Sequence, residues 1–423
     1  MFRRITRARP AQTSQPSRTF DPDAPETSGR TARLTDFAYL GETDIYLDAG
    51  CQSLRPQPVI DALAEYYTQY NACGGRVKYA WGRRVDAEVA DTRRAVLDLL
   101  GLSSRTHAVS FTLNTTYGLN LLLTQLPTGR YQRVLTSHIE HNSVFLPTIA
   151  AATRLGVPRI VLDRAPDGGL VYAPHELDNA VIVVSAASNI DGRLLTNLAA
   201  LVDDAHARGG IVIVDAAQAI AHSAALLRGT GADAVCFSAH KMYGASLGVV
   251  VATTVLLRSL DISFLGGGMV SDVREDSYDL VPDDPGALLE PGLQAWGEII
   301  ALHAAITWAK RVRLDGLTPD LFIERMSRRL FEGLRELPGV TMVNAAASPV
   351  VSLYVDGQDS HRLAVFLSKS GIMVRSGYFC AHHYLKEQLG LPPLLRFSLG
   401  LHTTESDIDR ALECFARLLK GLS

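Results

Sequence analysis

The stretch GADAVCFSAHKMYG, residues 231–244, contains the lysine around which we interpret the rest of the chain. Its apolar half, residues 234–237, predicts a buried strand that ends in Ser238, His240 and Lys241. An ammonium at the end of a buried strand is costly to desolvate unless it is paired or chemically converted. A Schiff base with an aldehyde is one such conversion, whereas a lone S-x-H-K more often marks a lysine that reaches solvent.

The sequence around this lysine alternates between short apolar runs and segments with helical spacing. The clearest helix is predicted over 194–208, with Gly209 and Gly210 as its stop. This alternation predicts an α/β fold with a mostly parallel, seven-stranded sheet that has helices on both faces. The predicted strands are 108–113, 133–136, 159–162, 180–185, 211–215, 234–237 and 247–252.

The 423 residues suffice for two domains and a tail. Residues 1–34 are rich in Arg, Pro, Ser and Thr, which predicts a disordered tail. A large domain is predicted over 35–305, of which 35–60 are expected to pack with the small domain. Residues 306–423 predict a small α+β domain. Within the large domain, 261–292 are expected to form an irregular loop or an arm toward a second subunit.

The composition indicates which kinds of partner and which cellular compartment to expect. The net charge is −3, so no overall field favours nucleic acid. No run of about 18 apolar residues is present, so we expect no membrane span. The five cysteines, at positions 51, 73, 236, 380 and 414, form no disulfide framework spacing. Their odd number fits a reducing, cytoplasmic location.

Polar residues follow five of the predicted strands, where ligands of parallel sheets bind. Asp215 could hold a protonated ring nitrogen, or it could cap a helix. Thr115 and Thr116 open a predicted helix, where hydroxyl and free N–H groups suit either a phosphate or simple capping. His141 could lie on a ring or serve as a structural histidine. The five polar segments are 114–116, 138–141, 188–189, 215 and 238–241.

Taken in order, these residues resemble the class V aminotransferase superfamily, fold-type-I enzymes that use pyridoxal 5′-phosphate (PLP). Two C-terminal motifs narrow the resemblance. RSGYFCA, residues 375–381, is similar to the R-x-G-x-x-C-A loop of group II (SUF-type) cysteine desulfurases and selenocysteine lyases, and RFS, residues 396–398, is similar to their R-x-S motif. The matching set is Thr115-Thr116, Glu140-His141, Ser188-Asn189, Asp215-x-x-Gln218 and Ser238-x-His240-Lys241.

The resemblance implies a role for each matched residue. Lys241 would hold the cofactor and move the α-proton, while His141 would stack on the ring and assist proton transfer. Cys380 would attack the sulfur of L-cysteine, giving a persulfide and alanine. The resemblance also implies that Asp215 contacts the pyridine nitrogen, and that Asn189 and Gln218 contact the ring oxygen and the substrate. The phosphate would be bound by Thr115, Thr116, Ser238 and His240. Arg375 and Arg396 would bind the substrate, and Arg396 would hold its carboxylate.

Three departures from the family pattern favour a specialised relative. Residues 75–79 read GRVKY, without the histidines of HRGIH, and Tyr378 and Phe379 stand where two histidines often precede the cysteine. Residues 292–294 read GLQ, without the G-T-P threonine that reaches the partner subunit's phosphate. A C–S lyase or aminotransferase, in which Cys380 is incidental, is therefore the alternative. The resemblance also implies a homodimer and a sulfur-acceptor protein. The spacing of Cys380, His382 and His383 matches no usual zinc pattern, so we expect no metal.

Overall fold

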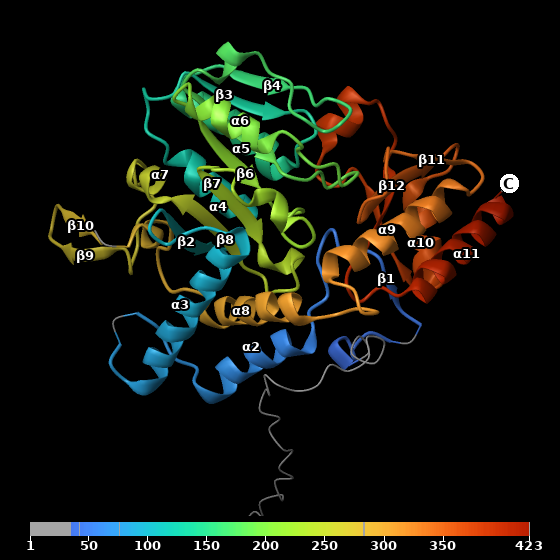
Figure 1. Ribbon diagram of the computed structural model, residues 1–423, viewed down its shortest axis with the longest axis horizontal. Helices are drawn as coiled ribbons and strands as arrows, with labels where there is room; N and C mark the ends of the chain where they lie inside the picture. Colours follow the sequence, from blue (N-terminus) through green and yellow to red (C-terminus); the bar gives the residue numbers. More distant parts are fainter. Residues whose placement is uncertain (1–34, 42, 76, 282–283, 423) are drawn as a thin grey trace, which may run out of the picture.

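The computed structural model describes residues 35–41, 43–75, 77–281 and 284–422 (Figure 1). The tail predicted over 1–34 and Arg76 of the GRVKY stretch both lie outside the described residues. None of the helices in the described part of the chain has the length and apolarity that a bilayer-spanning segment needs. All five cysteines are free thiols. The cytoplasmic location stays a prediction.

A seven-stranded sheet forms the centre of the larger half of the molecule (Figure 1). Strand β8 is antiparallel to both of its neighbours, and the other pairs are parallel, so the predicted mostly parallel α/β sheet is confirmed. The strands, in spatial order, are β2 (His107–Thr112), β8 (Gly248–Thr253), β7 (Ala234–Ser238), β6 (Ile211–Asp215), β5 (Ala180–Ser185), β3 (Arg133–Ser137) and β4 (Arg159–Leu162).

Both faces of this sheet are buried, which explains why its strands are continuous apolar runs. In β5, Val181 and Val183 belong to one core cluster, whereas Ile182 and Val184 belong to the cluster on the opposite face. Side chains alternate between faces along a strand, so an unbroken valine and isoleucine run supplies both cores. Helices α3 (Ala80–Leu100), α6 (Leu198–His206) and α8 (Trp296–Arg311) share the first core, and α4 (Thr115–Thr124), α5 (Asn142–Leu155) and α7 (Thr254–Arg258) share the second.

Two elements of the large sheet region differ from their predicted form. Helix α6 begins at Leu198 rather than at 194, because Leu194 forms a β-bridge with Ala187. The segment expected to be irregular, 261–292, contains an antiparallel hairpin of β9 (Val270–Val273) and β10 (Tyr278–Leu280). This hairpin projects from the body of the molecule (Figure 1, left).

A second, antiparallel sheet forms the C-terminal half, in the order β11 (Val340–Met342), β12 (Val350–Val355), β15 (Leu394–Ser398) and β14 (Arg375–Gly377). Helices α9 (Pro319–Arg335), α10 (Ser360–Lys369) and α11 (Glu405–Leu422) pack with it in a third core. Strand β14 was expected to be loop, since its residues Arg-Ser-Gly carry no apolar signal. It pairs with β15 all the same.

The N-terminal segment joins the two halves. Strand β1 (Ile45–Tyr46) runs parallel to β13 (Ile372–Met373), and Asp48 forms a β-bridge with Ser398. The chain then enters α2 (Gln57–Gln69), which packs against α8. Helix α8 supplies Ile299 to the core under the large sheet and Trp308 to the C-terminal core. The predicted boundary at 305–306 falls inside this shared helix, and the division into domains stays a prediction.

Candidate active site

Polar side chains from several strand ends surround a cavity of about 270 Å³. Asp215 ends β6 and Ser238 ends β7, while Asn189 follows β5. Carboxyl ends of parallel strands meet at one sheet edge, which is why residues far apart in sequence converge here. All twelve residues predicted for the site line this cavity: Thr115, Thr116, His141, Asn189, Asp215, Gln218, Ser238, His240, Lys241, Arg375, Cys380 and Arg396.

Lys241 lies on a short 3₁₀ turn, Ala239–Lys241, directly after β7. The loss of hydration on burial lowers the pKa of its ammonium, and the nearby Arg396 lowers it further, while Asp215 opposes both effects. A lysine whose charge is costly is a better nucleophile toward an aldehyde, because more of it is present as the free amine. The position therefore suits covalent attachment of a carbonyl compound.

Asp215 is a buried carboxylate at the end of β6. Its Oδ1 accepts a hydrogen bond from the backbone N–H of Ala217 at 2.8 Å. Burial raises the pKa of this carboxyl to about 6, although the hydrogen bond and Lys241 act in the opposite direction. A cationic group placed against Asp215 would stabilise its charged form.

His141 caps the N-terminus of α5 with its ring. Its Nδ1 accepts a hydrogen bond from the backbone N–H of Ser143 at 3.0 Å, so the neutral ring carries its proton on Nε2. Burial lowers the pKa of His141 to about 4, with Lys241 and Arg396 adding to the effect. The ring is therefore a neutral imidazole at pH 7, with a fixed tautomer.

Hydroxyl groups gather beside the N-terminus of α4. The Oγ of Ser238 accepts a hydrogen bond from the backbone N–H of Thr115 at 2.9 Å and also contacts the Thr115 hydroxyl at 2.6 Å. Thr116 shares a hydrogen bond of 2.6 Å with Ser143. Burial lowers the pKa of the nearby His240 to about 4. Donors of this kind at a helix start suit a phosphate.

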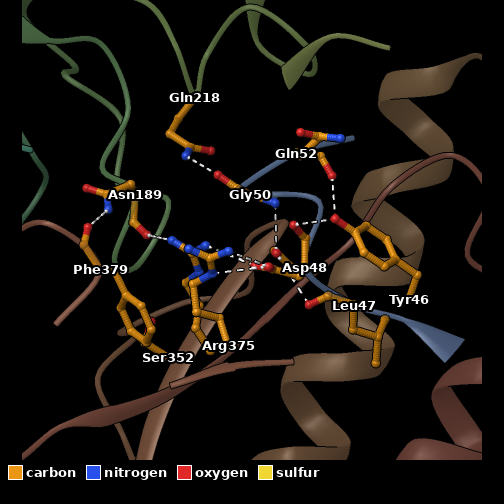
Figure 2. Close-up of polar contacts among 12 residues, drawn as sticks. Tyr46, Leu47, Asp48, Gly50, Gln52, Asn189, Gln218, Ser352, Arg375 and Phe379 are labelled. Carbon is orange, nitrogen blue, oxygen red and sulfur yellow. Dashed lines mark hydrogen bonds and ion pairs between the residues drawn. The ribbon is translucent and has the colours of Figure 1, made fainter. Parts of the chain in front are cut away.

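Arg375 and Arg396 of the C-terminal half converge on Asp48, and Figure 2 shows Arg375 beside it. Arg375 reaches the Oδ2 atom of Asp48 with its Nε and Nη2 atoms, both at 3.0 Å. The Nη2 atom of Arg396 contacts Oδ1 at 3.2 Å. Arg396 is buried, and its Nε has no partner among the described residues. Two cations and one carboxylate leave a net charge of +1, which matches one further carboxylate.

Asp48 is a site residue that our sequence analysis missed. It ends the strand-like run at 45–48, and a polar residue after an apolar run was the available signal. Its partners Arg375 and Arg396 lie more than 300 residues away in sequence, so spacing gave no reason to connect them.

Asn189 and Gln218 make protein contacts as well as lining the cavity. The Nδ2 atom of Asn189 donates to the carbonyl of Phe379 at 2.7 Å (Figure 2). The backbone carbonyl of Asn189 accepts a hydrogen bond from Arg396 at 3.1 Å. The Nε2 atom of Gln218 donates to the carbonyl of Gly50 at 2.8 Å. Each side-chain amide keeps a second N–H for a ligand. The predicted contacts with a ring oxygen stay predictions.

Cys380 lies on an unusual loop. Phe379 and Cys380 both have positive φ angles, 46° and 58°, a conformation that costs non-glycine residues energy. Their carbonyls accept hydrogen bonds from Asn189 and from the backbone N–H of Asn142. The Phe379 ring lies 4.7 Å from the guanidinium carbon of Arg396. The Cys380 residue itself is exposed and faces the cavity, as a transferring thiol requires.

Residues 45–411 match the family model described as aminotransferase class-V. This chain belongs to that family. A probable cysteine desulfurase of Methanothermobacter thermautotrophicus is 30% identical over 86% of this chain and 92% of its own length. A probable cysteine desulfurase of Vibrio cholerae is 28% identical over 88% of this chain and 93% of its own length. The apo structure of a cysteine desulfurase from Thermococcus onnurineus superposes with a TM-score of 0.83 at 28% identity, covering 94% of this chain and all of that chain.

Family membership makes PLP the cofactor, and the residues present fit it. The hydroxyl and N–H donors at the start of α4 suit its phosphate, and the Lys241 amine suits its aldehyde. Asp215 suits the protonated pyridine nitrogen, which would offset the burial that raises the pKa of the carboxyl. The partnerless Nε of Arg396 remains for a substrate carboxylate. Glu140, which precedes His141 in the family pattern, forms a buried ion pair with Arg164.

Proposed function

We propose that this enzyme removes sulfur from L-cysteine, leaving alanine and a persulfide on Cys380. The observation that carries the proposal is that one cavity holds the exposed Cys380, the carboxylate-binding Arg396 and the amine of Lys241. The curated relatives that cover most of the chain are named cysteine desulfurases, which supports the same reaction.

PLP supplies an electron sink at the α-carbon of the substrate amino acid. Arg396 binds the substrate carboxylate through its free Nε and a neighbouring N–H, which orients the Cα–H bond toward Lys241. The Lys241 amine takes the α-proton, and neutral His141 positions a proton on Nε2 above the site. These residues therefore bind, orient and move protons on the substrate.

The thiolate of Cys380 attacks the substrate sulfur. A bond forms between the two sulfur atoms while the Cβ–S bond breaks, and its electron pair remains with the carbon skeleton. Proton delivery to Cβ completes the methyl group of alanine. The balance is L-cysteine plus the thiol, giving alanine plus the persulfide, and it needs no oxidant.

Cys380→Ala tests this function against the lyase and aminotransferase alternatives. Incubation of the PLP-loaded enzyme with L-cysteine should yield alanine and transferable sulfur in equal amounts, and the variant should lose both by at least a hundredfold. The variant should still change the PLP absorption spectrum when L-cysteine binds. Formation of keto acids at the wild-type rate in Cys380→Ala would instead identify an aminotransferase.

We further propose that the enzyme is a homodimer and passes sulfur to an acceptor protein. Exposed apolar side chains beside the start of α4 support the dimer. The ring centroids of Tyr117 and Phe264 lie 6.2 Å apart in an edge-on arrangement. The exposed Leu265 and Leu293 lie on two chain segments that are joined by a hydrogen bond between Gly292 and Gly267. The exposure of Cys380 supports the acceptor, because the persulfide remains reachable from outside.

A further inference from the structure

The cavity contains a second thiol. Cys51 and Cys380 both line it, although they lie more than 300 residues apart in sequence. The residues that precede them meet the same group, since a Cβ atom at Gly50 would lie 3.5 Å from the guanidinium carbon of Arg396, and the Phe379 ring lies 4.7 Å from that carbon. The two cysteine-bearing segments therefore flank one guanidinium.

Three cations, Lys241, Arg375 and Arg396, line the same cavity as the two thiols. Burial lowers the pKa of Lys241 and of Arg396, and the nearby Cys51 opposes this effect at both cations, as Cys380 does at Lys241. Attack on a sulfur–sulfur bond requires a thiolate and releases a sulfur anion. Cations around the reacting sulfur atoms stabilise both species.

Cys51 and Cys380 lie in different kinds of backbone structure. Cys51 lies in a fixed turn, because its N–H donates to the carbonyl of Asp48 at 3.0 Å and the N–H of Ser53 donates to the carbonyl of His240 at 2.9 Å. Cys380 lies on the exposed loop with two successive positive φ angles. One thiol therefore enters the cavity from a hydrogen-bonded turn and the other from an exposed loop, and a shift of that loop would bring the two sulfur atoms together.

The other three cysteines lack this placement. Cys236 belongs to the core between the large sheet and helices α4, α5 and α7, where burial raises the pKa of its thiol. Cys73 lies between α2 and α3, and Cys414 lies on α11. None of the three lines the cavity.

We propose that Cys51 is a resolving thiol that discharges the Cys380 persulfide inside the site. The Cys51 thiolate attacks the inner sulfur of the persulfide, so that a Cys51–Cys380 disulfide forms and the outer sulfur leaves as hydrosulfide. The persulfide is the oxidant, and its outer sulfur is reduced. The balance is one persulfide plus one thiol, giving one disulfide plus one hydrogen sulfide. An external thiol reductant then restores both cysteines.

This inference rests on the proposed desulfurase function and adds a second route for the sulfur. The protein would transfer sulfur to an acceptor when one is docked, and would release sulfide when none is present. The disulfide would also stop turnover until a reductant arrives.

A single turnover tests the proposal. The PLP-loaded enzyme, freed of reductant, is mixed with one equivalent of L-cysteine, quenched by alkylation and mapped without reduction. We expect one alanine and nearly one sulfide per site, together with a peptide cross-linked between Cys51 and Cys380. In Cys51→Ser, which keeps the side-chain size, we expect Cys380 to retain the extra sulfur mass and sulfide per alanine to fall at least tenfold. Cys73→Ser, a matched change outside the cavity, should behave as wild type.

The outcomes separate this inference from the proposed function. Failure to form alanine, or to modify Cys380 in any way, would overturn the desulfurase function and this inference with it. Alanine together with a stable Cys380 persulfide in the wild type, and no cross-linked peptide, would overturn the role of Cys51 alone. An unchanged ratio of sulfide to alanine in Cys51→Ser would do the same.

Discussion

Asp215 is expected to destabilise the cofactor-free protein at neutral pH. Burial raises the pKa of its carboxyl from 3.8 to about 6, so the folded state holds the proton more tightly than the unfolded state does. The protonated carboxyl of Asp215 therefore stabilises the folded state fully below about pH 3.8, and this stabilisation is lost as the pH rises through about 6. A difference of about two pKa units corresponds to about 3 kcal/mol.

Asp215→Asn removes this charge. We expect the variant to unfold at a higher denaturant concentration than the wild type at pH 7.5 without PLP, and the advantage to shrink at pH 4.5, where Asp215 is protonated. The same variant should hold PLP more weakly, because the partner of the pyridine nitrogen is lost. A stability difference that is the same at both pH values would contradict the assigned cause.

Asp48 is expected to govern recognition of the substrate carboxylate. Asp48→Asn removes the charge that holds Arg375 and Arg396 together, and hydrogen bonds to charged groups contribute about 1.5–3 kcal/mol. We expect the KM for L-cysteine to rise about tenfold to hundredfold. L-Cysteinamide, which lacks the carboxylate, should lose much less. An equal loss for both substrates would refute the role, and Asp61→Asn on the exposed face of α2 is the matched control.

The catalytic candidates were accessible to sequence reasoning, because each is marked by a local pattern, either an apolar run or a motif. Asp215 and Lys241 come directly after strands, and the R-x-G-x-x-C-A resemblance identified Cys380. Asp48 and Cys51 were not identified as site residues, since their partners are brought to them by tertiary contacts. Local spacing carries information about neighbours on one element and none about a guanidinium more than 300 residues away.

At the scale of elements, α4 and β8 approach so closely that only glycine fits at 248. A Cβ atom there would lie 2.5 and 2.6 Å from backbone atoms of Asn114, the residue that caps α4 through the N–H of Tyr117. Gly248→Ala should displace the start of α4, cost about 1–3 kcal/mol of stability and weaken PLP binding. Thermal unfolding and PLP titration measure both effects. Gly421→Ala, where the added methyl meets open space, should leave both unchanged.

The elements that sequence predicted well are those with a strong apolar pattern. Strands β4, β5 and β6 have the predicted bounds, because each contains a run of valine and isoleucine, which is fully buried in β5 and β6. Strand β14 and the π-helical turn His383–Gln388 carry no such pattern and were not predicted. Both flank the Cys380 loop, so the least predictable backbone lies around the proposed nucleophile.

At the scale of the whole molecule, the N-terminal segment connects the cofactor side to the substrate side. Gly50 accepts a hydrogen bond from Gln218 of the large sheet region and donates one to Ser398 of the C-terminal sheet (Figure 2). Residues 35–60 were expected to pack with the small domain, but no individual contact of this segment was predicted. Such a connection depends on how two separately formed cores meet, which no local pattern encodes.

The homodimer is the remaining whole-molecule prediction. Phe264 is 50% exposed, and its ring packs edge-on near Tyr117 on α4, directly after Thr115 and Thr116 in the chain. An exposed aromatic pair is stabilised if a second copy covers it. Phe264→Arg should therefore yield monomers in sedimentation experiments and lower PLP retention, whereas Leu321→Arg, an exposed apolar position on α9, should leave the assembly unchanged. A wild-type monomer that retains PLP, or a Phe264→Arg dimer of wild-type stability, would show that this surface does not join subunits.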